Sequence, residues 1–449
     1  MLMIENTGVA PQEAFTLLGM STARHSDVSG IIGQFGSGSK HAVNVLLREG
    51  LNITVYCGLD RLVFGTERDT VDGHRVTHVT VAINKRQPKR LGWVLEFGEL
   101  DWTEVRMGLR EFVSNAIDRT LCEGGEIQDV NIGLVDPLKV KARSGYTRVF
   151  ISESEEVRDF CLTLNHHFLH FEGRQDESII EKPTVSPCRI YREGVFVCEI
   201  GNSICDYNFK KADLEIDESR NASEYIVRAA IARLYRNGTR EDLARVMKSL
   251  INGDTNTVES QLDGYYLSNS YNKTDAQKIE WQEAWKDASG GAVPCLVSEK
   301  KLKAFATRKG HDTVTLASTA WHEAIRNYEI PCLADILDGN EKAGRVVTKA
   351  SEASKQAVAT VWGWLVDAGM TKDKTPPQVA GFYDMMDAES EVLGYFEHGG
   401  DTVFLRNDQG GETLLQTALE EVTHYVTGST DMSRDIQDFA FRLVTRWLA

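Results

Sequence analysis

A row of three polar side chains on one predicted helix constrains this chain more than any other feature. Residues 102–122 carry apolar side chains at i, i+3 and i+4 spacing, which predicts an amphipathic helix with one buried stripe. Glu111, Asn115 and Asp118 follow at i, i+4 and i+7, so one helix face would carry two carboxylates and an amide. Such a row can orient a water molecule and ligate a hard cation through oxygen. An ordinary solvated helix face is the alternative interpretation.

Composition excludes several classes of protein. The 449 residues suffice for several domains, and 42% hydrophobic with 26% charged residues is typical of a soluble globular protein. The net charge of −16 argues against broad nucleic-acid or membrane binding through a basic surface. Eight scattered cysteines without a C-x-x-C pair favour reduced thiols, and we expect a cytoplasmic protein. The sequence has neither a signal-peptide pattern at its start nor an apolar run approaching the ~20 residues that span a bilayer.

The pattern of elements predicts a mixed α/β fold that begins with strands and ends with helices. In the first third, alternating apolar runs predict strands around one helical stretch. These strands are expected at 1–4, 52–57, 61–64, 76–84, 92–97, 130–134 and 146–152. The second half carries helical patterns at 276–288, 314–328, 348–368, 412–426 and 434–448.

Three glycines precede a predicted helix over residues 42–47. Gly33, Gly36 and Gly38 would let the backbone approach an anion closely, at the positive end of the helix dipole. This segment is not a Walker A loop, because that loop requires Lys directly after the last Gly, and here Ser39 intervenes. A plain turn is the alternative interpretation.

Four segments together resemble the GHKL ATPases, the family of the gyrase B subunit, the ninety-kilodalton heat-shock chaperone, histidine kinases and MutL. Residues 111–118 are similar to the family's helix motif E-x-x-x-N-A-x-D, and residues 31–38 resemble the glycine motif I-G-Q-F-G-x-G. Residues 4–10 resemble the motif I-x-D-N-G-x-G, and residues 18–22 resemble the L-G-x-S start of the nucleotide lid. In the family the helix motif comes first, whereas here it comes last. The resemblance therefore implies a circularly permuted Bergerat-type ATP-binding domain, an α+β sandwich.

The resemblance also implies a role for each matching residue. Glu111 would be the catalytic general base that polarises the attacking water, and Asn115 would hold Mg²⁺. Asp118 would support the adenine end of the site or its ordered waters, and the Thr147 hydroxyl would lie near the adenine. Residues 18–33 would form a lid that closes on ATP and couples the nucleotide state to dimer contacts. The ATP phosphates would be bound by Gly33, Gly36 and Gly38, with Ser39 and Lys40 as further candidates.

The adenine-binding motif departs from the family pattern at Asn6. The family has an Asp there, which accepts a hydrogen bond from the adenine amino group. Asn6 can accept through its amide oxygen but without charge assistance, and Glu5 is an alternative acceptor. Gly8 matches the first glycine of that motif, whereas Ala10 replaces the second.

Beyond the ATP-binding domain, expected over residues 1–152, two further regions are predicted. Residues 153–260 resemble the transducer domain of several family members, in which a lysine reaches the γ-phosphate. Lys210 and Lys211 are the candidates for that lysine. Residues 261–449 are expected to form a mostly helical domain.

The C-terminal region contains a helix pattern similar to the H-E-x-x-H helix of zinc metallopeptidases. Glu421 and His424 match the general base and the second zinc ligand, but Glu420 replaces the first histidine. This pattern favours a degenerate peptidase-like domain without metal. A zinc metallopeptidase that uses this helix remains an alternative.

The resemblance to the GHKL ATPases as a whole implies slow Mg²⁺-dependent ATP hydrolysis that opens and closes a homodimer. The expected macromolecular partner is a protein rather than a nucleic acid, because the chain is acidic. The other alternative is an interaction protein that binds nucleotide without hydrolysing it.

Overall fold

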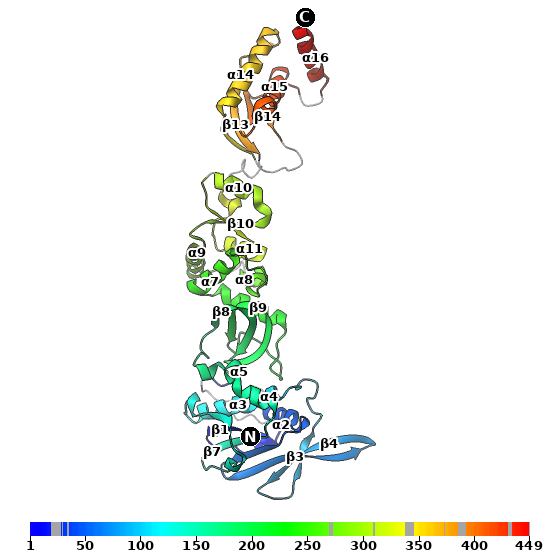
Figure 1. Cartoon of the computed structure of the whole chain (residues 1–449), viewed down its shortest axis with the longest axis vertical. Coiled ribbons are helices and arrows are strands. Elements are labelled where there is room, and N and C mark those ends of the chain that lie inside the picture. Colours follow the sequence, from blue (N-terminus) through cyan, green and yellow to red (C-terminus); the bar gives the residue numbers. More distant parts are fainter. Residues whose placement is uncertain are drawn as a thin grey trace. The chain divides into compact units, whose positions relative to one another are not determined.

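The computed structural model describes residues 1–18, 28, 30–33, 36–268, 273–308, 310–336, 345–371, 373–384, 392–429 and 433–448 (Figure 1). The chain forms two compact units. The first comprises Met1–Asp242 and Asp254–Asn269, and the second comprises Leu243–Gly253 and Ser270–Ala449. The first unit includes the expected ATP-binding region and most of the expected transducer-like region.

A seven-stranded sheet lies at the centre of the first unit. Its strand order is β5-β4-β3-β2-β7-β1-β6, and neighbouring strands are antiparallel. The late strand β7 pairs with β2 on one side and with β1 on the other, so Val149 lies between Val55 and Ile4. The strands are β1 (Leu2–Thr7), β2 (Ile53–Cys57), β3 (Asp60–Val71), β4 (His74–Ile83), β5 (Lys89–Val94), β6 (Asn131–Leu134) and β7 (Tyr146–Ile151).

Helices α2 (Gly38–Arg48) and α3 (Val105–Cys122) pack on one face of this sheet (Figure 1). Alternate strand residues such as Ile4 and Val55 join their apolar side chains in one core, as period-2 alternation requires. The two helices approach closely at Gly108, where an added Cβ would lie 2.8 Å from Val45 Cγ1. Helix α3 confirms the amphipathic helix predicted from residue spacing. The short helices α1 (Glu13–Thr16) and α4 (Glu155–Leu162) also belong to this unit.

Strands β3 and β4 form a hairpin longer than the sequence indicates. Asp72 and Gly73 form its turn with φ of 47° and 80°, the left-handed pair that suits a two-residue hairpin turn. The predicted strand at 61–64 is only the buried start of β3, because the outer half carries exposed charged residues that hide the alternation.

The remainder of the first unit is built around the long strands β8 (Ile179–Arg192) and β9 (Val195–Phe209). Glu193 and Gly194, both with positive φ, form the turn between them. The end of β8 pairs with the start of β9 as a hairpin (Arg192↔Val195, Tyr191↔Phe196) and in parallel with its end (Arg192↔Phe209). The helices are α5 (Leu164–His167), α6 (Glu224–Arg236), α7 (Arg240–Ile251), whose residues from Leu243 belong to the second unit, and α8 (Gly264–Leu267).

The second unit combines helices with two sheets. Strands β10 and β11 form a parallel pair, and a four-stranded sheet has the order β12-β13-β15-β14. Helices α14 and α15 share a core with that sheet. The strands are β10 (Val293–Leu296), β11 (Thr313–Leu316), β12 (Arg345–Lys349), β13 (Gln378–Asp384), β14 (Gly394–Phe396) and β15 (Thr402–Arg406). The helices are α9 (Asp275–Ser289), α10 (Lys300–Arg308), α11 (Thr319–Asn327), α12 (Leu333–Ile336), α14 (Glu352–Asp367), α15 (Gly411–Thr427) and α16 (Arg434–Leu448).

The structure confirms the mixed α/β class and corrects part of the element pattern. The helix predicted over 314–328 is strand β11 followed by helix α11, and the start of the helix predicted over 348–368 belongs to strand β12. Among the described residues, none of the helices combines the length and the apolar character that crossing a membrane requires.

Candidate functional site

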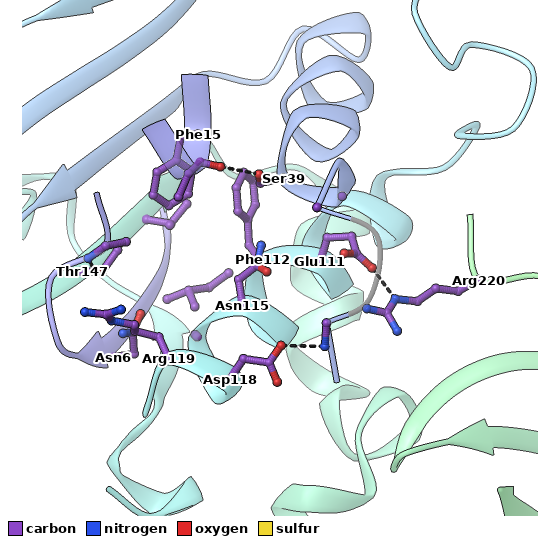
Figure 2. A pocket seen from close by; sticks show the side chains of 18 of the residues that line it. Asn6, Phe15, Ser39, Glu111, Phe112, Asn115, Asp118, Arg119, Thr147 and Arg220 are labelled. Carbon is purple, nitrogen blue, oxygen red and sulfur yellow. Dashed lines mark hydrogen bonds and ion pairs between the residues drawn. The ribbon is translucent and has the colours of Figure 1, made fainter. Parts of the chain in front are cut away.

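The first unit contains an open cavity with about 80 Å³ of space accessible to water. Figure 2 shows most of the residues that line it. They come from β1, α1, α2, α3, β7, the segment before α6 and the stretch with Gly33 and Gly36 before α2, which we call the glycine segment. Apart from the alternative candidates Glu5, Lys210 and Lys211, the cavity brings together every residue predicted for the nucleotide site except Gly8 and Lys40. Those that line it are Asn6, Gly33, Gly36, Gly38, Ser39, Glu111, Asn115, Asp118 and Thr147.

Helix α3 presents Glu111, Asn115 and Asp118 to the cavity, as their spacing predicts (Figure 2). Asn115 is exposed, although both of its neighbours on the helix are buried. Its amide oxygen is therefore a hard ligand atom that a cation can reach. Glu111 and Asp118 are buried, and each has partners that define its position.

Asp118 holds the backbone of the glycine segment. Its two carboxylate oxygens accept from the backbone N–H groups of Ile32, at 2.6 Å, and Gly33, at 2.7 Å. Burial raises the pKa of Asp118 to about 6, whereas these two hydrogen bonds and the nearby Arg220 and Lys211 act in the opposite direction. Asp118 thus connects α3 to the segment that is expected to bind phosphate.

Glu111 forms a buried ion pair with Arg220, whose Nε donates to Glu111 Oε1 (Figure 2). Its other oxygen packs against Gly38, the first residue of α2. A Cβ added at Gly38 would overlap Glu111 Oε2 and lie 2.9 Å from its Cδ. A side chain at this position would therefore require the Glu111 carboxylate to move, a steric constraint that the spacing of the glycines alone does not reveal.

The glycine segment enters the site at the start of α2. Gly36 adopts a φ of 81°, which favours glycine, and Ser39 Oγ donates to Ala14 O at 2.8 Å. Lys40 is fully buried and does not line the cavity, and its Nζ donates to Gly36 O at 2.9 Å. Burial lowers the pKa of Lys40 to about 8. The first N–H groups of a helix such as α2 have no intrahelical partner and can meet an anion.

The opposite end of the cavity is formed by β1 and β7. Asn6 is buried, and its Nδ2 donates to Thr7 O at 2.6 Å. Thr147 Oγ1 accepts from Ala10 N and donates to Gly8 O, both at 2.8 Å, so it ties the two ends of the glycine turn after β1. Gly8 itself adopts a φ of 84° outside the cavity lining.

The alternative acceptor Glu5 does not reach this cavity, because successive strand residues point to opposite faces of the sheet. It is buried on the other face, where it pairs with Arg143 at 2.8 Å and with Arg148 at 2.7 Å. Of the transducer lysines, Lys211 Nζ lies 3.5 Å from Gly33 O, whereas Lys210 pairs with Asp176 at 3.8 Å. Most of the predicted lid lies outside the described residues.

Three further charged residues of the cavity lining were not predicted. Arg119, Glu218 and Arg220 line the cavity, and the last two come from the segment between β9 and α6. Arg220 has a φ of 65°, which is uncommon for a residue with a side chain. Arg119 lies four residues after Asn115 on the same helix, and this spacing was the sequence feature that could have indicated it.

The degenerate peptidase-like helix is α15 in the second unit. Glu421 and His424 are buried, and His424 Nδ1 lies 2.7 Å from Ser429 O. Gly394 of β14 packs against Glu421, where an added Cβ would lie 2.7 Å from Glu421 Cγ. Within the described part of the chain, His, Cys, Asp and Glu side chains do not form a group of three suited to hold a metal.

We compared the chain with protein-family models, with curated proteins and with solved structures. None of the three comparisons gives a match.

Proposed function

We propose that the first unit binds ATP with Mg²⁺ in this cavity and hydrolyses it slowly, as a circularly permuted Bergerat-type domain. One observation carries the proposal. Residues chosen from three of the four sequence motifs that resemble the GHKL ATPases, together with Thr147, line a single cavity. A chance set of motifs scattered over the sheet would not share one cavity.

The chemistry of the lining supports this ligand. The phosphates would meet the backbone of Gly36 and Gly38 and the start of α2, where the helix dipole favours negative charge. The base would lie toward Asn6 and Thr147. Asn115 would hold Mg²⁺ through its amide oxygen, since this ion needs only one or two protein ligands when phosphates supply the others.

Glu111 is the proposed general base. Its carboxylate would orient a water molecule and take its proton as the water attacks the terminal phosphorus. When bound, Mg²⁺ supplies charge stabilisation at the phosphate oxygens. Arg220 is the buried cation closest to Glu111 among the described residues, and its positive charge is available to the same oxygens.

At the level of the whole protein, we propose that nucleotide binding changes the contacts of a homodimer. The partner on which it acts would be a protein, because a net charge of −16 disfavours nucleic acid. Sedimentation with and without an ATP analogue would test the dimer.

The decisive test is calorimetry, in which an ATP analogue or a GTP analogue is titrated, in the presence of Mg²⁺, into the wild type and into Asn115→Ala. We expect adenine-selective binding that Asn115→Ala weakens by about tenfold or more, the loss typical for removal of one essential polar contact. Arg90→Gln, which removes only exposed ion pairs with Glu67 and Asp69, is a control within the same unit. Failure of the wild type to bind either analogue would overturn the proposal.

A hydrolysis assay on Glu111→Ala separates the ATPase from the non-hydrolysing alternative. The ATPase predicts measurable turnover in the wild type that this substitution abolishes. Binding without turnover in the wild type would favour the nucleotide-gated interaction protein instead.

A further inference from the structure

The carboxylate of Glu111, the proposed general base, is engaged in an ion pair with Arg220. Both side chains are more than nine-tenths buried, and both line the cavity beside Gly36, Gly38 and Asn115. Arg220 Nε donates to one Glu111 oxygen, and the other oxygen packs against Gly38. A carboxylate oxygen that accepts from a guanidinium is occupied and is not available to accept from a water molecule. In this arrangement Glu111 is not free to act as a base.

The chain holds Arg220 in this position through a tightly bonded loop. Asp217 accepts from the Asn221 N–H at 2.8 Å and from Ser219 Oγ at 2.7 Å, and the Arg220 N–H donates to Asp217 O at 3.1 Å. Arg110, from the same helix as Glu111, donates to Ser219 O at 3.1 Å. The loop therefore enforces the left-handed φ of Arg220, and such an enforced conformation is often a functional device.

Phosphate is a ligand that can compete with Glu111 for the guanidinium of Arg220. Phosphate oxygens bind guanidinium at least as well as carboxylate oxygens do, and often in a bidentate manner. The glycine segment that would hold the phosphates passes directly beside the ion pair, since Gly38 contacts Glu111 and Gly36 lines the same cavity.

We propose that the Glu111–Arg220 ion pair is a lock on the general base, and that the terminal phosphate of a nucleoside triphosphate opens it. The phosphate takes the guanidinium, and Glu111 is released to orient water only when that phosphate is present. A diphosphate does not open the lock. This inference rests on the proposed function, because it concerns the regulation of the same site.

The lock makes a prediction about binding that does not depend on turnover. Because opening the ion pair opposes triphosphate binding, Glu111→Gln should strengthen the binding of a non-hydrolysable ATP analogue. It keeps the side-chain shape but removes the charge that holds Arg220. We expect the affinity to rise by about tenfold, a factor within the usual range of coupling between contacting residues. The affinity for ADP should change by less than about twofold.

A double-mutant cycle isolates the ion pair. Wild type, Glu111→Gln, Arg220→Gln and the double variant are titrated calorimetrically with the ATP analogue and with ADP, each with Mg²⁺. Arg220→Gln should weaken binding of the analogue, and Glu111→Gln should have no further effect in that background. If Arg220→Gln does not fold, Arg220→Lys replaces it in the cycle, because it keeps a cation next to Glu111. In the Arg220→Lys background, Glu111→Gln should still strengthen binding of the analogue, but by less than in the wild type. Arg174→Gln removes an exposed pair with Glu177 and is the matched control.

The outcomes separate this inference from the proposed function. If the wild type binds neither ATP analogue nor ADP, the proposed function fails. If the wild type binds both, two results overturn the lock alone: Glu111→Gln changes both affinities equally, or its effect persists in full in the Arg220→Gln background. A triphosphate-selective gain that vanishes with Arg220 supports it.

Discussion

Asp118 shows at the scale of one residue how burial and hydrogen bonding compete. Burial raises its pKa to about 6 from an ordinary value of 3.8, so the folded chain binds the proton more tightly than the unfolded chain. Its contribution to the free energy of unfolding is therefore largest below pH 4 and decreases as the pH rises to about 6. The decrease amounts to about 3 kcal/mol, and it levels off above that pH.

Urea unfolding of wild type and Asp118→Asn between pH 4 and pH 8 tests this prediction, because asparagine does not titrate. The unfolding free energy of wild type relative to the variant should fall between pH 4 and pH 6 and then stay constant. A wild type that instead gains stability over the variant in that interval would contradict the assigned direction of the shift.

Some residues of the site could be predicted from the sequence and others could not. Glu111, Asn115 and Asp118 were found because helical spacing places them on one face. Arg220 was not found, because a left-handed backbone at a residue other than glycine leaves no sequence signal, and its partner lies 109 residues earlier in the chain. Glu5, the alternative acceptor, could have been excluded from the sequence, because neighbouring residues of a strand such as Glu5 and Asn6 point to opposite faces of the sheet.

At the scale of elements, Arg110 connects α3 to the segments that carry Arg220. Its guanidinium is buried and donates to Phe196 O of β9 at 2.8 Å and to Ser219 O at 3.1 Å. Burial lowers its pKa to about 10, which leaves it charged at neutral pH. Arg110→Met would leave both carbonyl groups without this donor and free the loop that positions Arg220.

We expect Arg110→Met to lower the free energy of unfolding by about 1–3 kcal/mol, the usual loss when buried polar groups lose their partner. It should also weaken binding of the ATP analogue, which calorimetry would measure. Arg106→Met on the same helix removes only an exposed pair with Glu104 and should change the stability by less than about 0.5 kcal/mol. Equal effects of the two substitutions would show that Arg110 has no special role.

Elements with strong local periodicity were predicted well, and those that depend on distant pairing were not. Helices α3 and α16 follow from apolar spacing, although α3 is buried on most of its surface, where polar residues such as Glu111 and Asp118 line the cavity. The order of the central sheet does not follow, because β7 separates β2 from β1 through contacts across more than 90 residues. The sheet of the second unit was missed for a different reason: short strands such as β12 and β11 run directly into helical patterns.

At the scale of the whole molecule, the two sequence hypotheses fall into different compact units. Every residue that lines the candidate nucleotide cavity belongs to the first unit, and the peptidase-like helix α15 belongs to the second. Chemistry at one site therefore does not require residues from the other. The division also explains why one chain can resemble two unrelated families.

This division predicts that the double variant Glu421→Ala/His424→Ala binds the ATP analogue as the wild type does, within about twofold. Both side chains are buried in the second unit, so we expect lower stability of that unit without loss of the nucleotide site. Calorimetry measures the affinity of the variant for the ATP analogue. Metal analysis of the purified wild type measures its zinc content. We expect well below one zinc ion per chain, because α15 offers Glu420 where the peptidases have histidine. Stoichiometric zinc that the double variant loses would revive the peptidase alternative, and loss of nucleotide binding in the variant would show that the units act as one.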